Sequence, residues 1–368
     1  MQDNAHRTNR PSARNMTGKA SAHSKVFELL VPGLLGPVPL PPGHRVETPL
    51  LDLLLTRGRQ SAVTGGNLTG ALLARFGADA SAPFCLADDD PDWDQTGFCM
   101  HADPVHLRPD RDLLRLFDAR HLGISGAEAQ LLVAELNDHF AQDGLRFNAP
   151  TASRWYLHCE QPPALQTEPL ERVIGQHVDG LLPTGPDADR WANLMNETQM
   201  LLFQSAVNQR RESEGRPGVN GLWTWGGGSW QVPTGVQLPT KVQAQSPLAR
   251  GLAAAAGVES EPPSALWQTP KGTLLADWNQ LQDAVLDTDE LAWVAAAESL
   301  DRRLAPVVDA LGAGDLDQIL LNGCKGQCWS IDRADLRAFW RRSWTTPWRR
   351  PRQLAELVAQ AASGLETR

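Results

Sequence analysis

The sequence predicts an α/β fold in which a mainly parallel sheet carries helices on both faces, with a small α+β insert. Short apolar runs alternate with longer helix-like segments over most of the 368 residues, and this alternation is typical of parallel strands joined by helices. The segment 97–159 departs from the pattern. Two strand-like runs, a helix and a third strand follow one another there, which indicates a separate α+β unit.

The first predicted unit is a strand, a glycine turn and a helix. The strand covers 26–31 and runs into Pro32 and Gly33. The helix covers 48–58, with a threonine, a proline and a glycine where its cap, first turn and end are expected. Because ligands of open α/β sheets bind beyond the carboxyl ends of strands, Pro32 and Gly33 are expected to face a site. They offer backbone groups there and no charge.

The insert is expected to begin with a hairpin of strands 97–105 and 113–117. A capping-box sequence starts the helix 125–140, and a strand follows over 154–159. After the insert, the apolar periodicity predicts one long helix over 187–214.

The rest of the chain alternates strands with helices. Strands are expected over 219–225, 241–245, 273–276, 317–321 and 327–331, and helices over 71–76, 247–256, 289–311, 332–342 and 353–362. The predicted division is a disordered tail over 1–24, an α/β core made of 25–90 and 180–345, an α+β insert over 91–179, and a basic helical tail over 346–368.

Composition and charge narrow the class of protein. No apolar run is long enough to cross a membrane, and the net charge of −9 argues against general nucleic-acid binding. The five cysteines are scattered, which favours free thiols in a reducing compartment. The polar N-terminus lacks the apolar segment of a secretion signal, so a cytoplasmic protein is expected.

Histidines and tryptophans are distributed unevenly. All nine histidines lie at or before His177, and eleven of the thirteen tryptophans lie at or after Trp191. Since histidine is the usual neutral-pH base and a common metal ligand, the second half has little means for such chemistry. We expect no bound cofactor.

The densest His/Asp cluster is formed by His101, Asp103 and His106. On a strand, His101 and Asp103 share one face. A metal or phosphate site is one interpretation, and a hydrogen-bonded His–Asp pair at a strand end is the other.

A glycine run offers a candidate ligand site. Trp225, Gly226, Gly227 and Gly228 follow a predicted strand, and successive glycines let backbone amides approach an anion. A tight turn packed between tryptophans is the alternative. Asn196 adds a further candidate, because it lies on a polar strip of the long predicted helix.

Two features near the C-terminus also have two interpretations. Cys324 and Cys328 could be redox-active, but their spacing favours free thiols.

Trp340, Trp344 and Trp348 alternate with arginines, which indicates either a docking surface for a partner or an apolar stripe packed on the body.

The stretch 47–58 resembles a Thr-Pro-x-Leu-Asp segment of the alkaline phosphatase superfamily, and it is most similar to the archaeal-type cofactor-independent phosphoglycerate mutases. The Trp-Thr-Trp-Gly-Gly-Gly run at 223–228 and the stretch 193–197 resemble, more narrowly, a bacterial group of phosphoglycerate-mutase-like or RpfE-type regulatory proteins. The resemblance covers roughly residues 25–345 and implies an alkaline-phosphatase-like fold.

The resemblance also implies where catalysis would reside. Such mutases hold two metals around a phosphorylated Ser or Thr, and two metals stabilise both oxygens of an in-line transfer. Here Pro32 stands where the first Asp ligand is expected, Asn67 where the nucleophile is expected, and 322–326 where an Asp-His pair is expected. The resemblance thus implies that the metal site is lost.

The preferred hypothesis is a catalytically degenerate mutase relative that acts as a regulatory or metabolite-sensing protein for a small anionic compound. One alternative is an active mutase or metal-dependent phosphotransferase with a rearranged site using Thr69, His101, Asp103 and His106. The other is an interaction module in which 337–368 docks a protein partner.

Overall fold

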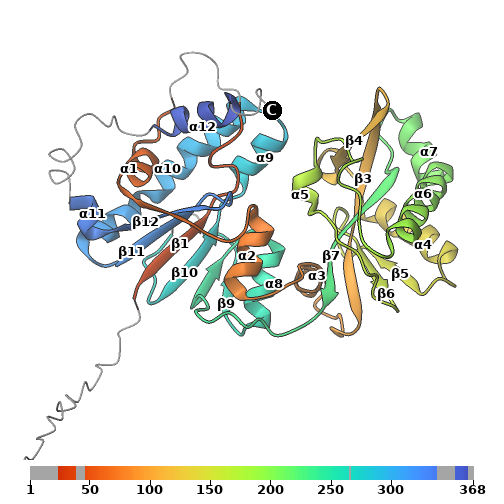
Figure 1. Ribbon diagram of the computed structural model, residues 1–368, viewed down its shortest axis with the longest axis horizontal. Coiled ribbons are helices and arrows are strands. Elements are labelled where there is room, and N and C mark those ends of the chain that lie inside the picture. The colour runs from red at the N-terminus through yellow and green to blue at the C-terminus, as the bar shows by residue number, and fades with distance from the viewer. Residues whose placement is uncertain (1–23, 39–45, 265–266, 338–352, 364–368) are drawn as a thin grey trace, which may run out of the picture.

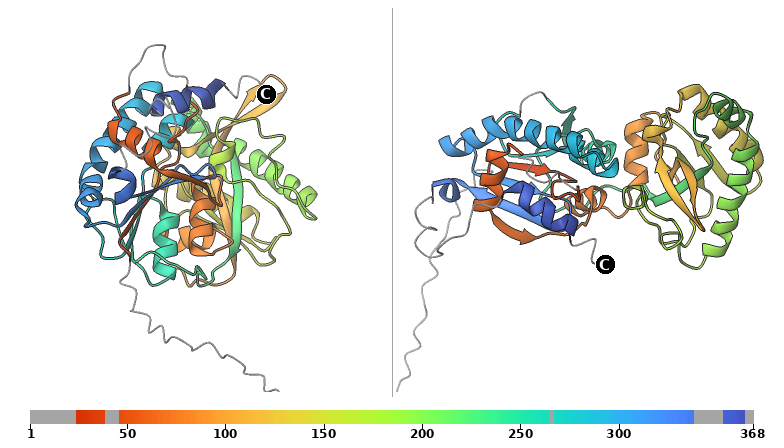
Figure 2. Two further views of the ribbon diagram at one scale, coloured as in Figure 1. Left: turned by 60° about the vertical axis from the view of Figure 1, so that its left-hand side comes forward. Right: turned by 90° about the horizontal axis from the view of Figure 1, so that it is seen from above.

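The computed structural model describes residues 24–38, 46–264, 267–337 and 353–363. Figure 1 shows two sheets, each with its own helices, and the two are seen side by side from above in Figure 2. We call them the large sheet and the small sheet. The predicted N-terminal tail lies outside the described residues apart from its last position.

The large sheet has seven strands in the order β2-β12-β11-β1-β10-β8-β9. The central strand β1 pairs in parallel with β10 and β11, and β8 pairs in parallel with β10 and β9. Strands β12 and β2 add an antiparallel edge. The prediction of a mainly parallel sheet is therefore confirmed. The strands are β1 (Val26–Leu30), β2 (Arg59–Ala62), β8 (Lys241–Gln243), β9 (Glu259–Glu261), β10 (Thr273–Asp277), β11 (Gln318–Asn322) and β12 (Gln327–Asp332).

Helices cover both faces of the large sheet, as the sequence predicts. Along β1, Phe27 and Leu29 point into one apolar layer and Leu30 into the other, which follows from the two-residue period of a strand. The first layer is closed by α1 (Pro49–Arg57), α9 (Gln280–Leu286), α10 (Glu290–Ala313) and α12 (Leu354–Ser363). The second is closed by α2 (Leu68–Phe76), α3 (Ala82–Asp89) and α8 (Pro247–Ala255).

The small sheet is antiparallel. The hairpin of β3 (Phe98–Asp110) and β4 (Leu113–Asp118) is confirmed, and β6 (Tyr156–Cys159), which pairs with the first residues of β3, joins β5 (Leu145–Asn148) to the sheet. Helices α4 (Gly126–His139), α6 (Ala188–Gln204) and α7 (Ala206–Ser213) pack against it, with the short α5 (Leu170–Val173) nearby.

The strand β7 (Gly221–Ser229) belongs to the small sheet, because it pairs with β3 over most of its length. The prediction that all of 180–345 belongs with the large sheet is therefore wrong for β7. The chain returns to the large sheet only after β7.

Two local differences from the predictions have clear causes. The long helix 187–214 is two helices, because Ser205 adopts an extended conformation, accepts a hydrogen bond from the backbone of Val207 and starts α7. Helix α3 was not predicted, although Ser81 and a proline in the first turn are its start signals.

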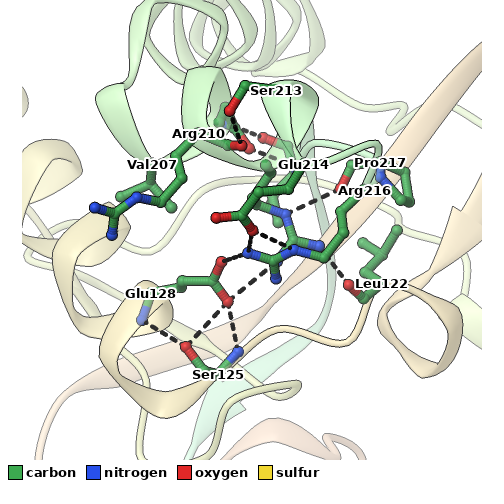
Figure 3. A network of polar contacts seen from close by, with 12 residues as sticks. Leu122, Ser125, Glu128, Val207, Arg210, Ser213, Glu214, Arg216 and Pro217 are labelled. Carbon is green, nitrogen blue, oxygen red and sulfur yellow. Dashed lines mark hydrogen bonds and ion pairs between the residues drawn. The ribbon is translucent and has the colours of Figure 1, made fainter.

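The start of α4 confirms the predicted capping box of Ser125 and Glu128. Glu128 also forms ion pairs with Arg211 (3.1 Å) and Arg216 (2.9 Å), and Figure 3 shows the pair with Arg216. Arg211 is fully buried and its Nε donates to the carbonyl of Pro217 at 3.0 Å. This network joins α4 to the end of α7.

Candidate functional site

The strongest candidate site is a cavity of about 250 Å³ at the carboxyl ends of the large-sheet strands. We call it the strand-end cavity. Leu30, Asp277 and Asn322 are level in the strand register, so β1, β10 and β11 end together beside it. Its walls are formed by Pro32, Gly33, Gly66, Asn67, Leu68, Glu171, Arg172, Gln282, Cys324 and Lys325.

Gly33 is required by backbone packing. Its φ of +78° suits glycine, and a Cβ there would lie 2.6 Å from the backbone nitrogen of Gln282. Its carbonyl accepts a hydrogen bond from Nε1 of Trp293 at 2.9 Å. Helix α9 therefore lies directly against the turn where the resemblance places an Asp-Gly pair.

Asn67 is the N-cap of α2. Its Oδ1 accepts a hydrogen bond from the backbone of Gly70 at 2.7 Å, which satisfies one free donor of the first turn. An amide in this role has no nucleophilic oxygen for phosphoryl transfer. Thr69, one position inside the helix, donates its backbone N–H to Glu171 at 3.2 Å.

Beyond β11 the cavity presents a cation. Asn322 Oδ1 accepts from the backbone of Cys324 at 2.9 Å, and Cys324 has a φ of +54° that brings the chain round. The next residue, Lys325, lines the cavity and donates to the carbonyl of Gly36. More than a third of its surface is exposed, yet neighbouring atoms desolvate the ammonium enough to lower the pKa of Lys325.

Two carboxylates of the second half of the chain, Asp277 and Asp289, have structural partners. Asp277 is buried and accepts from the backbones of Gln245 (2.8 Å) and Ser246 (2.9 Å), which ties β10 to the start of α8. Burial raises its pKa. Asp289 caps α10 by accepting from the backbone of Ala292. Within the described ranges, no group of three or more His, Cys, Asp or Glu side chains is placed to hold a metal ion.

His101 and Asp103 are buried together in the small sheet and both contact Trp225. The His101 ring stacks on the indole with centroids 4.1 Å apart, and Trp225 Nε1 donates to Asp103 at 2.7 Å. Burial lowers the pKa of His101 to about 3 and raises that of Asp103 to about 7. A neutral histidine and a desolvated carboxylate are thus held side by side.

The other members of the predicted cluster lie apart from this pair. His106 Nδ1 is 2.8 Å from the carbonyl of Gly218, which it reaches from β3. Thr69 lies on α2 and lines a different cavity, together with Trp225, Gly226 and Gly227. Asn196 lines a third, mainly apolar cavity beside α6. The structure therefore brings Thr69 to the glycine run and leaves His106 and Asn196 elsewhere.

The glycine run is part of strand β7 and does not form a separate loop. A bulge in the β3–β7 pairing falls between Cys99 and His101, and Gly226 has a φ of +62°. A Cβ on Gly226 would collide with Ser81 Oγ, and one on Gly227 would lie 2.6 Å from the Phe98 ring. Close packing alone accounts for these glycines.

Among the described residues, all five cysteines are free and buried, which confirms the prediction of free thiols. Of the basic, tryptophan-rich C-terminal stretch, residues 338–352 lie outside the described residues. Leu354 and Val358 of α12 are buried in the first apolar layer, so this helix is part of the body.

Glu171 and Gln282 line the strand-end cavity from α5 and α9 and were not predicted from the sequence. Nothing in their local sequence marks them, because only the fold brings the small-sheet segment against the strand ends.

Within the described ranges, no helix is long and apolar enough to cross a membrane.

Two phosphoglycerate mutases illustrate what this chain is similar to in sequence. A probable 2,3-bisphosphoglycerate-independent phosphoglycerate mutase of Geobacter sulfurreducens is 28% identical over 200 residues, covering 51% of this chain and 50% of that protein. The enzyme of Methanosarcina acetivorans is 26% identical over 201 residues, covering 50% and 48%. The chain thus spans about half the length of these relatives.

Among solved structures, a protein of Pyrococcus horikoshii aligns with a TM-score of 0.47 at 14% identity, covering 84% of this chain and 88% of that one. No family model matches the chain. Over about half its length, the chain is thus similar in sequence, at low identity, to 2,3-bisphosphoglycerate-independent phosphoglycerate mutases.

Proposed function

We propose that this protein has lost mutase catalysis and acts in the cytoplasm as a regulatory or metabolite-sensing protein that binds a small anion. The ligand is a phosphorylated or carboxylated metabolite, and its anionic group lies in the strand-end cavity. The observation that carries the proposal is Lys325, a cation at the strand ends where the resemblance implies metal ligands.

The cavity's chemistry supports binding more than phosphoryl transfer. The resemblance expects a metal ligand at Pro32, the nucleophile at Asn67 and an Asp-His pair within 322–326, the stretch that contains Lys325, and these three residues line one cavity. Lys325 supplies positive charge, Arg172 is paired with Glu168 at 2.9 Å, and Glu171 accepts a hydrogen bond from the backbone of Thr69. An ammonium is a point charge suited to phosphate and carboxylate groups.

Binding is tested by calorimetry of the purified full-length protein with 3-phosphoglycerate and with inorganic phosphate. We expect Lys325→Ala to weaken binding at least about tenfold, which corresponds to about 1.4 kcal/mol. Exposed Lys271 provides the matched control, since Lys271→Ala removes the same charge away from the cavity.

The position of the anion is tested at Gly66. A Cβ on Gly66 would meet nothing within 4 Å, so the cavity wall accepts a side chain there. Gly66→Asp is expected to abolish anion binding by charge repulsion, whereas the isosteric Gly66→Asn retains it. Equal binding by both variants, or no heat with either probe in the wild type, contradicts the proposal.

Loss of catalysis is tested separately, by metal analysis and by a mutase assay after loading with Mn, Mg, Co or Zn. We expect no stoichiometric metal and no turnover. Turnover with any of these metals would establish the alternative of an active enzyme with a rearranged site.

A further inference from the structure

A second cavity, of about 280 Å³, lies between α2, the start of α3 and the strands β3 and β7. We call it the Trp225 cavity. Its lining includes the rings of Phe98 and Trp225 and the polar side chains of Asp79, Ser81 and Thr167. This volume lies just below the range of roughly 300–1,000 Å³ that is usual for ligand pockets, so it fits a small molecule.

The Ser81 hydroxyl is a buried group without a partner. Ser81 has no exposed surface, and among the described residues its Oγ has no hydrogen-bond partner. Although Ser81 occupies the N-cap position of α3, its side chain does not cap the helix. An unsatisfied buried hydroxyl costs roughly 1–3 kcal/mol. Because the Oγ presents almost no accessible surface, a hydrogen-bonding group in the cavity would satisfy it once the Ser81 side chain rotates toward the cavity.

Trp225 is fixed in place as one wall. The stacked His101 ring covers one face of the indole, and Nε1 is occupied by Asp103. The parts of Trp225 that line the cavity are therefore carbon surfaces held without rotational freedom. His101 and Asp103 act here as positioning residues, and burial keeps the His101 ring neutral by lowering its pKa to about 3.

The charges of the lining residues determine which ligands the Trp225 cavity can bind. Among its described lining residues, none is Lys, Arg or His, and Asp79 is the charged one. An anion is repelled by Asp79 and finds no cation. Hydroxyl groups, in contrast, find Ser81, Thr167 and Asp79 as partners, and the C–H face of a ring finds Trp225 and Phe98.

We propose that the Trp225 cavity binds a neutral polyhydroxy compound of the sugar or cyclitol type, with one hydroxyl on Ser81 Oγ and its C–H face on Trp225. This site is separate from the strand-end cavity. Asn67 and Leu68 line one and Thr69 and Leu73 the other, so the first turns of α2 lie between them.

The test is titration of the full-length protein with myo-inositol and with D-glucose, followed by saturation-transfer difference NMR. We expect saturable binding that Ser81→Ala weakens by roughly five- to tenfold, the loss of one hydrogen bond. Leu73→Trp, which fills the cavity, is expected to abolish it. Ser81→Ala is also expected to leave the unfolding midpoint unchanged or raised, because the hydroxyl it removes bonds nothing in the free protein.

The controls distinguish this site from the proposed anion site. Lys325→Ala and Gly66→Asp should leave polyol binding intact, and Ser81→Ala should leave phosphoglycerate binding intact. The inference is overturned if neither polyol saturates, if binding is equal in Ser81→Ala, or if n-butylamine binds in preference to the polyols, which would indicate a cation site built on Asp79.

Discussion

Replacing Asp103 with asparagine should change how stability depends on pH. The folded protein holds this carboxyl with a pKa of about 7, mainly because burial disfavours its charge, whereas the unfolded value is near 3.8. Between pH 4 and 7 the folded state therefore keeps a proton that the unfolded chain has released. Raising the pH through this window therefore lowers the free energy of unfolding. Above pH 7 the contribution of Asp103 no longer changes.

The size of the effect follows from the two pKa values. A single proton corresponds to about 1.4 kcal/mol for each pH unit, so the whole window amounts to roughly 4 kcal/mol. The amide of Asp103→Asn does not titrate. The difference in unfolding free energy, variant minus wild type, should therefore rise by this amount between pH 4 and 7 and stay constant above pH 7.

His101 supplies a control of opposite sign. Its pKa is lowered to about 3 in the folded state, against 6.5 when unfolded, so stability is lost as the pH falls from 6.5 toward 3. In the wild type the two slopes oppose each other between about pH 4 and 6.5. Each single variant removes one of these two pH dependences. The unfolding free energy of His101→Gln, relative to that of the wild type, should therefore increase as the pH falls.

The assay is urea unfolding of the wild type, Asp103→Asn and His101→Gln at pH intervals from 4.5 to 8. Comparison with the wild type cancels the contributions of all other groups. A difference for Asp103→Asn that is flat, or that falls as the pH rises, would refute the reasoning. It would mean that the carboxylate is hydrated in the folded protein.

Three further predictions concern packing, a buried charge and thiol reactivity. Gly251→Ala should destabilise the protein by about 3 kcal/mol or more, because the new methyl group would collide with the Phe84 carbonyl between α8 and α3; Gly126→Ala, with open space around it, should not. Arg211→Met should cost about 2–4 kcal/mol in chemical unfolding by leaving two carbonyls without their donor and Glu128 with Arg216 as its remaining ion-pair partner, and Arg211→Lys should recover part of that loss. An Ellman titration at pH 8 should find the thiols unreactive until the protein is denatured, since burial raises the pKa of Cys99 and Cys159 to about 12 and that of Cys328 to about 11.

Local signals predicted individual elements well where short-range physics decides them. The capping box of α4, the Gly- and Pro-marked ends of α1, and the β3–β4 hairpin all lie where the sequence indicated. Each depends on residues within one or two turns of each other. The break at Ser205 was missed, although a serine is a helix-start signal and the apolar residues end at Val207.

Pairing between distant segments was harder to predict. Strand β7 was assigned to the large sheet because it follows the insert in sequence, yet its partner is β3, more than a hundred residues earlier. Cavity-lining residues such as Glu171 and Gln282 carried no local signal, since they become neighbours of Lys325 only when the two sheets and α9 are in place.

The sequence by itself determined the α/β class, the free thiols and the absence of a carboxylate at Pro32, of a hydroxyl at Asn67 and of an Asp-His pair at 322–326, because these depend on residue type and short-range periodicity. Tertiary structure alone decided that those three positions share one cavity, that the glycine run is a packed strand, and that His101 and Asp103 hold Trp225. Such facts depend on contacts between residues far apart in the chain, which a linear pattern does not record.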